Sequence, residues 1–531
     1  MLINSIEFLI FLLGIVLIYK IVPKKVKWLV LLISSYIFYF SNSTYLILCM
    51  LFTTLSIYLV ALKIGKIDDE CKKISKTIDD KEKKKKIKQD SKKNKKRVLV
   101  FGILLNLAVL IFIKYSGFIG EGINSLFKIL HIEFNIPLKE FILPLGISYY
   151  TLQAISYIVD VYRGKIKADK NIGRVALFLA FFPQLVEGPI GRYDKLANNL
   201  YEPHEITYKN ICFGTQLMLW GFFKKMVIAD RVAMYANEVF NNYTAYSGPI
   251  IVLGALAYTL QIYAEFSGGI DIVRGAAEIF DIHLDQNFER PFFARSIDEF
   301  WRRWNITLGT WLKDYVFYPV SLSKASVKVT NVSKKIFKDT YLSKLVPIAF
   351  SLLFVWLCNG IWHGAGAKYI VYGLYYYVIM MLGKIFAPLF EKTIKIFKIN
   401  TKVWSYKLFQ ILRTDMFVCI GMTIFRAENL RTFFEMVKSI FNVHNLENIF
   451  NGKAFMLGGL NPGDIAIIVI SSIILLVTSI YKEKGLKFRE SLAKQNLIFR
   501  WIVLYALIFI IIIFGIYGKG YNIQSFIYGQ F

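Results

Sequence analysis

The sequence is poor in charged residues, in cysteine and in histidine. Charged residues make up 19% of the 531 positions, whereas a water-soluble domain normally carries about 25%. The five cysteines show no CxxC or other metal-ligand spacing, and most of them lie in apolar runs. We therefore expect neither a disulfide framework nor a metal site. The low charge also argues against a chain built from several soluble domains.

Long apolar runs take the place of the missing charge. Apolar residues make up 56% of the chain and aromatic residues 16%, and the mean hydropathy is +0.47. Several runs approach about 20 residues, the length that a helix needs to cross the hydrocarbon core. The sequence thus predicts an all-α, polytopic transmembrane protein with about eleven crossings, together with re-entrant or interfacial helices. The crossings are drawn from apolar segments at 5–22, 28–40, 44–62, 98–113, 141–161, 175–186, 211–223, 250–266, 346–358, 369–390, 409–424, 465–480 and 501–516.

The net charge of +28 owes a large share to one lysine-rich stretch, residues 63–97, which contains KEKKKK and KKNKKR. Under the positive-inside rule this stretch predicts a disordered, basic cytoplasmic loop, and hence an extracytoplasmic N-terminus for a multi-pass protein of the cell membrane. Docking to anionic lipid headgroups is a second interpretation. Nucleic-acid binding is not expected, because the stretch has neither interleaved aromatic residues nor a folded motif. Segment 5–22 lacks a basic n-region and a cleavage site, which favours a retained span over a signal peptide.

The motif LCNGIWHGAG, residues 357–366, places His363 between two apolar segments. An ionisable side chain at membrane depth is costly and is usually functional or tightly paired. Histidine is also the side chain best suited to proton transfer near neutral pH. We predict that His363 carries the chemistry. The remaining histidines lie in polar connections and are expected at the surface: His131, His204, His283 and His444.

The segment FWRRWNITLGTWLKDYVFYPV, residues 300–320, is too polar to span a membrane. One interpretation is an interfacial amphipathic helix with an aromatic belt and cations that reach toward water. Asn305 stands out within it because its short amide both donates and accepts hydrogen bonds. It can orient a substrate hydroxyl or carbonyl, or it can bond to a neighbouring helix.

Two carboxylates near a glycine-rich stretch, Glu265 and Asp271, are candidates for buried charges. A buried carboxylate needs a cation or several hydrogen bonds to offset its desolvation. These two either take part in a site or pair with Arg274 or Arg290, and the sequence favours neither interpretation.

Five long motifs, in order, resemble the membrane-bound O-acyltransferase family. They are PLGISYYTLQAISYIVDVYRGK (144–165), FFPQLVEGPIGRYDKL (181–196), EFSGGIDIVRGAAEIFDIHLDQNFERPF (265–292), FWRRWNITLGTWLKDYVFYP (300–319) and NGIWHGAG (359–366). The branch that they resemble most is that of the alginate O-acetylation membrane protein, with relatives in exopolysaccharide and peptidoglycan acetylation; the tail SFIYGQF (525–531) is similar to the usual ending of that branch. The resemblance implies one integral-membrane acyltransferase domain over 1–531, with the catalytic motifs in 141–390.

The resemblance also implies a ring of tilted helices around a thinned centre. His363 matches the family's membrane histidine, and Asn305 matches the second catalytic position, where this branch usually has histidine and the wider family often has asparagine. Because an asparagine cannot shuttle a proton, His363 is expected to act as the base, while Asn305 positions or polarises the substrate. Tentative substrate contacts are expected from Trp304, Arg303, Glu265 and Gly364, the last through its backbone N–H.

The resemblance further implies acetyl-CoA as the acyl donor, with no bound cofactor. An extracytoplasmic, SGNH-hydrolase-like acetyltransferase would then pass the acetyl groups to an exported or cell-wall polysaccharide. Within the family, the alternative is D-alanyl transfer from a carrier-protein thioester, as in teichoic-acid modification. From another class, the alternative is a transporter or flippase in which His363 couples to protons, although the sequence lacks the internal repeat of many transporters.

Overall fold

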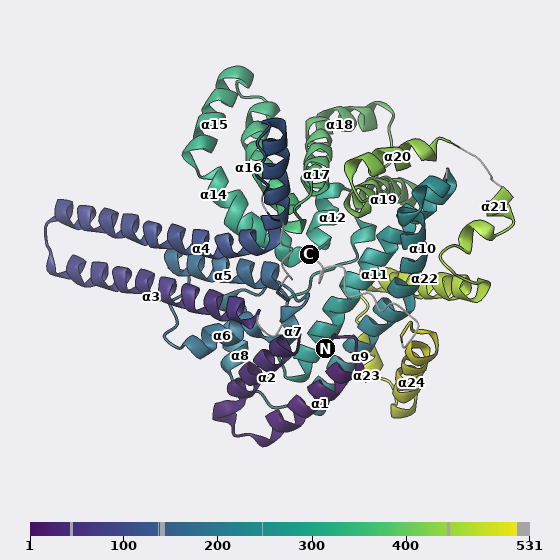
Figure 1. Cartoon of the computed structure of the whole chain (residues 1–531), viewed down its shortest axis with the longest axis horizontal. Coiled ribbons are helices and arrows are strands. Elements are labelled where there is room, and N and C mark those ends of the chain that lie inside the picture. The colour runs from purple at the N-terminus through teal and green to yellow at the C-terminus, as the bar shows by residue number, and fades with distance from the viewer. Residues whose placement is uncertain (43–45, 136, 138–143, 247, 443–446, 518–531) are drawn as a thin grey trace. The chain divides into compact units, whose positions relative to one another are not determined.

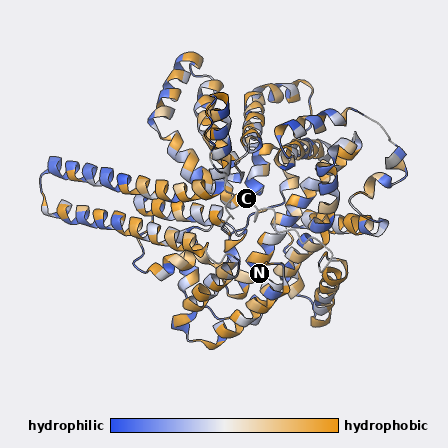
Figure 2. Ribbon diagram, in the orientation of Figure 1, coloured by the Kyte–Doolittle hydropathy of each residue, from blue (hydrophilic) through white to orange (hydrophobic). Residues whose placement is uncertain are grey.

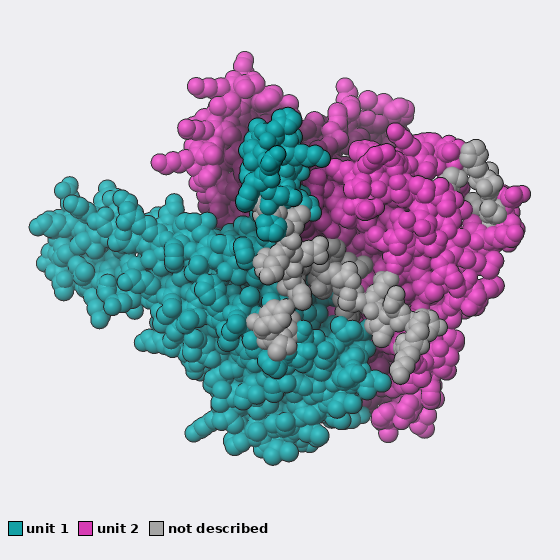
Figure 3. Space-filling view, viewed as in Figure 1, with its two compact units in different colours: residues 1–215, 273–285, 528–531 teal, residues 216–272, 286–527 magenta. Residues whose placement is uncertain are grey.

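A computed structural model describes residues 1–42, 46–135, 137, 144–246, 248–442 and 447–517. This part of the chain is helical throughout its regular structure, and its one strand-like feature is an isolated antiparallel bridge between Phe288 and Trp304 (Figure 1). The chain divides into two compact units (Figure 3). Unit 1 is mainly Met1–Thr215 with Val273–Asp285, and unit 2 is mainly Gln216–Ile272 with Gln286–Ile527.

Unit 1 has its core around α5, which is buried along nearly its whole length. Helices α3 and α4 both pack against α5, and α6 packs against α2 and α3. A cluster of phenylalanine rings from α1, α2 and α7 fills the space beside them, centred on Phe182. The helices are α1 (Ile6–Ile21), α2 (Lys27–Asn42), α3 (Ile47–Thr77), α4 (Lys81–Ile129), α5 (Ile147–Arg163), α6 (Ile172–Ala180), α7 (Phe182–Leu185), α8 (Tyr193–Tyr201) and the start of α9 (Tyr208–Phe222).

The lysine-rich stretch is helical, so the expectation of a disordered loop over 63–97 is wrong. Helices α3 and α4 run side by side as a hairpin whose outer half is hydrophilic (Figures 1 and 2). Only residues 78–80 separate them. Lysine, glutamate and glutamine are good helix formers, and Asp68 of α3 pairs with Lys95 of α4 at 2.5 Å and with Lys72 at 2.7 Å. We call residues 63–97 the basic arm.

Unit 2 is built around the long helices α11 and α16. Two π-helical turns interrupt its other helices, η2 (Phe223–Ala229) and η5 (Lys313–Phe317). The remaining helices are α10 (Asp230–Asn241), α11 (Pro249–Ile279), α12 (Ile297–Arg303), α13 (Ile306–Leu312), α14 (Tyr318–Ser321), α15 (Lys324–Phe337), α16 (Tyr341–His363), α17 (Ala367–Ile385), α18 (Ala387–Ile396), α19 (Trp404–Arg426), α20 (Leu430–Ile440), α21 (Glu447–Phe450), α22 (Pro462–Glu483), α23 (Phe488–Ala493) and α24 (Leu497–Phe514).

The expected all-α membrane architecture is confirmed, whereas the count of about eleven crossings is not. Among the described residues, eight helices are long and apolar enough to cross a membrane, or nine if α17 and α18, bent by 48°, form one span. The difference arises from short helices: α1 and α2 have 16 residues each and α6 has nine.

The segment 300–320 does not form the single interfacial helix that the sequence suggested. It consists of α12, α13, η5 and α14, and it breaks at Trp304 and Asn305. Three hydrogen bonds accepted by Asn287, which precedes α12 in the chain, fix this break, as described below. The broken path, rather than a continuous helix, sets the orientation of Asn305.

Helices α16 and α17 approach so closely that glycine is required on both. A Cβ at Gly360 would overlap the carbonyl oxygen of Tyr369, and a Cβ at Gly373 would overlap that of Trp356. Small residues allow such backbone contact between membrane helices. This contact fixes the end of α16, where His363 lies.

We expect Gly373→Ala to lower the thermal midpoint Tm of the purified protein, because the added methyl group forces α16 and α17 apart at a cost of about 1–3 kcal/mol. Gly383→Ala is the matched control, since Gly383 lies on the same helix and its Cβ would meet no atom within 4 Å. There, alanine should raise helix stability by about 0.5–1 kcal/mol. Equal losses in both variants would show that the close contact is not what stabilises this pair.

Candidate functional site

His363 is the last residue of α16 and is only 2% exposed. Three aromatic rings surround the imidazole edge-on, with centroid distances of 4.8 Å to Trp362, 5.1 Å to Phe425 and 5.6 Å to Tyr372. The chain then turns at Gly364, where a Cβ would overlap the ring of Tyr369. The imidazole is therefore held in one position within an apolar environment.

The aromatic layer continues from His363 to α12. The ring of Trp301 lies 4.7 Å from that of Tyr376 and 5.1 Å from that of Trp356. Tyr372 contacts both sides, since its centroid is 6.4 Å from that of Trp301 and 5.6 Å from that of His363. The segment that carries Asn305 and the helix that carries His363 are thereby packed through shared side chains, and α13 also packs against α16.

Asn305 occupies the break between α12 and α13 in the left-handed region, with φ +42° and ψ +55°. Asparagine and histidine adopt this region several-fold more often than other non-glycine residues. The backbone thus favours both residue types that the family resemblance leads one to expect here. The side chain is 3% exposed, and its Oδ1 atom has no hydrogen-bond partner in the part of the chain that the structure describes.

Asn287 holds the turn at Asn305 in place. Its backbone oxygen accepts from the N–H of Ile306 at 3.1 Å. Its side-chain Oδ1 accepts from the N–H of Thr307 at 3.0 Å and from the hydroxyl of the same residue at 2.6 Å. The sequence analysis missed this residue, which lies in the motif QNFERPF without any charge or periodicity to mark it.

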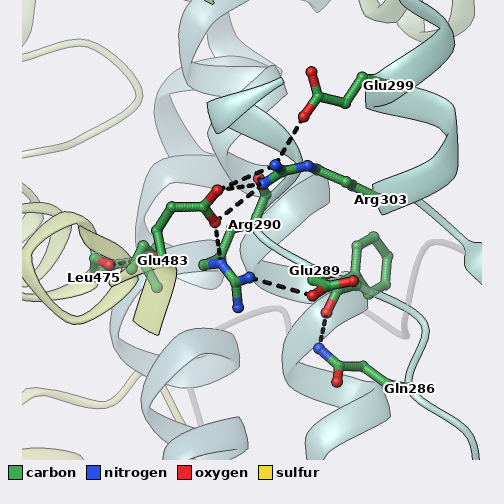
Figure 4. Close-up of polar contacts among 9 residues, drawn as sticks. Gln286, Glu289, Arg290, Glu299, Arg303, Leu475 and Glu483 are labelled. Carbon is green, nitrogen blue, oxygen red and sulfur yellow. Dashed lines mark hydrogen bonds and ion pairs between the residues drawn. The ribbon is translucent and has the colours of Figure 1, made fainter. Parts of the chain in front are cut away.

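Arg303 is clamped by two carboxylates (Figure 4). Its guanidinium donates to Glu483 at 3.1 Å and to Glu299 at 2.8 Å, and Arg290 donates to the same carboxylate of Glu483. Burial opposes the charge of Arg303, but the ion pairs with Glu483 and Glu299 outweigh it, and the pKa of the guanidinium is raised. Glu483 ends α22, so the clamp ties that helix to the segment ahead of Asn305.

Trp304 is buried in an aromatic cluster on the other side of the same segment. Its ring is stacked on Phe300 at 5.4 Å and meets Phe288 edge-on at 5.0 Å. These contacts, and the clamp on Arg303, anchor the segment on both sides of its backbone. The substrate contacts expected of Trp304 and Arg303 stay predictions, as does that of the Gly364 N–H.

Glu265 pairs with a lysine, a partner that the sequence analysis did not name. The carboxylate is buried on α11 and lies 2.9 Å from Lys225, which also lies 2.8 Å from Asp230. The neighbouring Lys224 lies 2.8 Å from Asp271. Both lysines belong to the π-helix η2. The sequence does contain one sign of buried charge here, the two adjacent lysines inside the apolar run GFFKKMVIA.

His204 is not at the surface, contrary to expectation, whereas His131 and His283 are exposed. The His204 side chain is 15% exposed, with Nδ1 3.2 Å from a carboxylate oxygen of Asp281 and Nε2 2.7 Å from the backbone oxygen of Asn199. His444 lies outside the described residues.

Comparison with known proteins agrees with this geometry. The sequence model of the MBOAT, membrane-bound O-acyltransferase family matches residues 165–333, a stretch that includes Asn305 and ends before His363. A protein of Pseudomonas syringae pv. tomato named "Probable alginate O-acetylase AlgI" is 31% identical over 80% of this chain and 72% of its own length.

Two further relatives act on cell-wall polymers by their names. The peptidoglycan O-acetyltransferase of Helicobacter pylori is 30% identical over 66% of this chain and 65% of its own length. The teichoic acid D-alanyltransferase of Bacillus subtilis is 30% identical over 54% of this chain and 69% of its own length. The motifs, the helical membrane architecture and these similarities agree. The chain belongs to the membrane-bound O-acyltransferase family, and it is a multi-pass membrane O-acyltransferase.

Proposed function

We propose that the protein moves acetyl groups from cytosolic acetyl-CoA for the O-acetylation of an exported or cell-wall polysaccharide. The breadth of the similarity supports this choice: the alginate relative matches 80% of the chain, against 54% for the D-alanyl relative. D-alanyl transfer from a carrier-bound thioester is the second candidate, because the identity over the shared part is equally high, at 30%. An extracytoplasmic SGNH-like acetyltransferase is the proposed partner that completes transfer to the polymer.

In the proposed reaction, His363 Nδ1 or Nε2 takes the proton of the attacking hydroxyl while the hydroxyl oxygen adds to the thioester carbonyl. The tetrahedral intermediate then expels the thiolate of coenzyme A, which recovers the proton from the imidazolium. The aromatic rings around His363 exclude water, so a developing charge interacts strongly with the few polar groups nearby.

Asn305 is proposed to orient the substrate through its amide. Its Oδ1 can accept from a substrate O–H or N–H, and its Nδ2 can donate to the developing oxyanion. The backbone N–H of Gly364 is the proposed second donor to that oxyanion. The observation that carries this assignment is the buried amide oxygen of Asn305, which has no partner among the described residues and which Asn287 holds on a segment packed against α16.

Purified protein in proteoliposomes should consume radiolabelled acetyl-CoA, and His363→Ala should lower this turnover by about 10²–10⁴, the usual loss for a positioned base. The reason is that the other carboxylate or amide side chains predicted for the site are poor bases here: Glu265 is paired with Lys225, and Asn305 cannot take a proton. His283→Ala is the control, since that side chain is 67% exposed and should leave turnover unchanged. A transporter would leave the thioester intact, and a folded His363→Ala variant with normal turnover would refute the role of the base.

Substitutions at Asn305 can distinguish a loss of activity caused by backbone strain from one caused by loss of the side-chain amide. Glycine adopts the left-handed region freely, whereas alanine adds strain there of about 1–2 kcal/mol. We expect activity to fall from wild type to His, then Gly, then Ala, then Asp, the last because a carboxylate repels the oxyanion. Loss of one oxyanion-type hydrogen bond costs at most roughly 3–4 kcal/mol, so Asn305→Gly should lose less than His363→Ala. Full activity of the Gly and Asp variants would exclude Asn305 from the chemistry.

The basic arm is proposed to be cytoplasmic, with the N-terminus outside. A cysteine placed at the exposed Asp79, in the turn between α3 and α4, should resist an impermeant maleimide in intact cells, because lysine-rich segments are retained inside. A cysteine at the exposed Ser41, near the end of α2, should be labelled by the same maleimide. The unchanged protein shows how much label its own five cysteines take up. The reverse pattern would invert the orientation and the side of the donor.

A further inference from the structure

Asn359 is a buried asparagine whose amide oxygen lacks a partner. It lies on α16, is 5% exposed, and its Oδ1 makes no hydrogen bond to any described residue. A buried, unpaired carbonyl oxygen costs about 1–3 kcal/mol, and each such atom in a native structure calls for an explanation. At membrane depth the cost is not relieved by bulk water.

A second buried asparagine of the same chain shows the alternative arrangement. Asn106 on α4 is 2% exposed, and both ends of its amide are bonded. Its Nδ2 donates to the backbone oxygen of Gly102 at 2.8 Å, and its Oδ1 accepts from the hydroxyl of Ser56 at 3.1 Å. Asn106 has the bonds of a structural asparagine, and Asn359 does not.

Asn359 shares a helix face with the proposed base. It precedes His363 by four residues on α16, so the two Cβ atoms are about 5–6 Å apart on one face. The adjacent Gly360 fixes that part of α16 against Tyr369 of α17. The unpaired oxygen therefore lies one helical turn from the imidazole.

A donor group complements this acceptor nearby. The indole Nε1 of Trp301 is buried without a hydrogen-bond partner in the described chain. Its ring packs against Trp356, which precedes Asn359 by three residues on α16. A secondary amide carries one N–H and one C=O, so one acceptor and one donor of this kind match its two polar atoms.

We propose that Asn359 is a substrate-binding residue whose Oδ1 accepts the hydrogen bond of the amide N–H in the pantetheine arm of the thioester donor. This inference rests on the proposed function. The amide is favoured over the attacking hydroxyl, because that hydroxyl has one proton and must give it to His363. Two methylene groups separate the thioester sulfur from the first amide nitrogen of the arm, which suits a contact one helical turn from the base.

The test compares two acetyl thioesters that differ in this amide. S-acetyl-N-acetylcysteamine has the amide, and S-pentyl thioacetate replaces its N–H and C=O with two methylene groups. Asn359→Leu should raise KM about 3–10-fold for the first thioester, the value of one hydrogen bond, and leave KM for the second unchanged. Its Tm should not fall, because leucine removes an unpaired polar atom. Asn106→Leu, the matched control, should lower Tm without separating the two thioesters.

Four results would overturn the proposal. A fall in Tm of Asn359→Leu like that of Asn106→Leu would make the residue structural. An equal loss for both thioesters, with a raised KM for the acceptor, would assign the hydrogen bond to the acceptor hydroxyl. If the wild type consumes neither thioester nor acetyl-CoA, the proposed function itself fails, whereas turnover by the wild type with no discrimination by the variant rejects Asn359 alone.

Discussion

A polar atom inside a bilayer has no water to bind, and this constraint accounts for most of the arrangement in unit 2. The carboxylates of Glu265 and Asp271 pair with the two ammonium groups of η2, Glu265 with Lys225 and Asp271 with Lys224. Arg303 is bound by Glu483 and Glu299. The buried amide oxygens of Asn305 and Asn359 have no hydrogen-bond partner among the described residues, and neither do those of Gln216 and Gln261. Asn305 and Asn359 differ from the two glutamines in lying on α16 or on the segment packed against it, and they are the two that we propose to bind a substrate.

The position of the site depends on backbone contact more than on side-chain chemistry. Gly360 and Gly373 bring α16 against α17 and so determine where His363 lies. On the facing segment, Asn287 binds the chain on the far side of Asn305 and keeps the left-handed turn. Small displacements of a catalytic group lower the rate strongly. If His363 and Asn305 have the roles proposed above, helix contact and the hydrogen bonds of Asn287 are what hold them in place.

The sequence predicted the class of fold, because long apolar runs are local signals; the catalytic roles of His363 and Asn305 stay predictions. It did not predict that Lys225 pairs with Glu265 or Lys224 with Asp271, because each lysine lies 40 or more residues away from its partner and no periodicity marks the pairing. Asn287 and Asn359 were missed for a related reason: an uncharged amide gives no signal until its hydrogen bonds are known. The short buried helix α6 was read as part of a crossing, because hydropathy alone does not distinguish protein from lipid as the apolar surround.

The basic arm was predicted as a disordered loop but is helical, so its like charges are held at fixed spacings along α4. Residues 81–97 carry eleven basic and two acidic side chains. Lys81, Lys84, Lys85, Lys88 and Lys92 line one face of α4. Like charges three and four residues apart destabilise a helix by about 0.2–0.5 kcal/mol per pair, and dissolved salt weakens the effect. The screening length is about 8 Å at physiological ionic strength, so the outer end of α4 gains helical order as the salt concentration rises. A protein held together by surface ion pairs responds in the opposite way, because salt weakens those pairs.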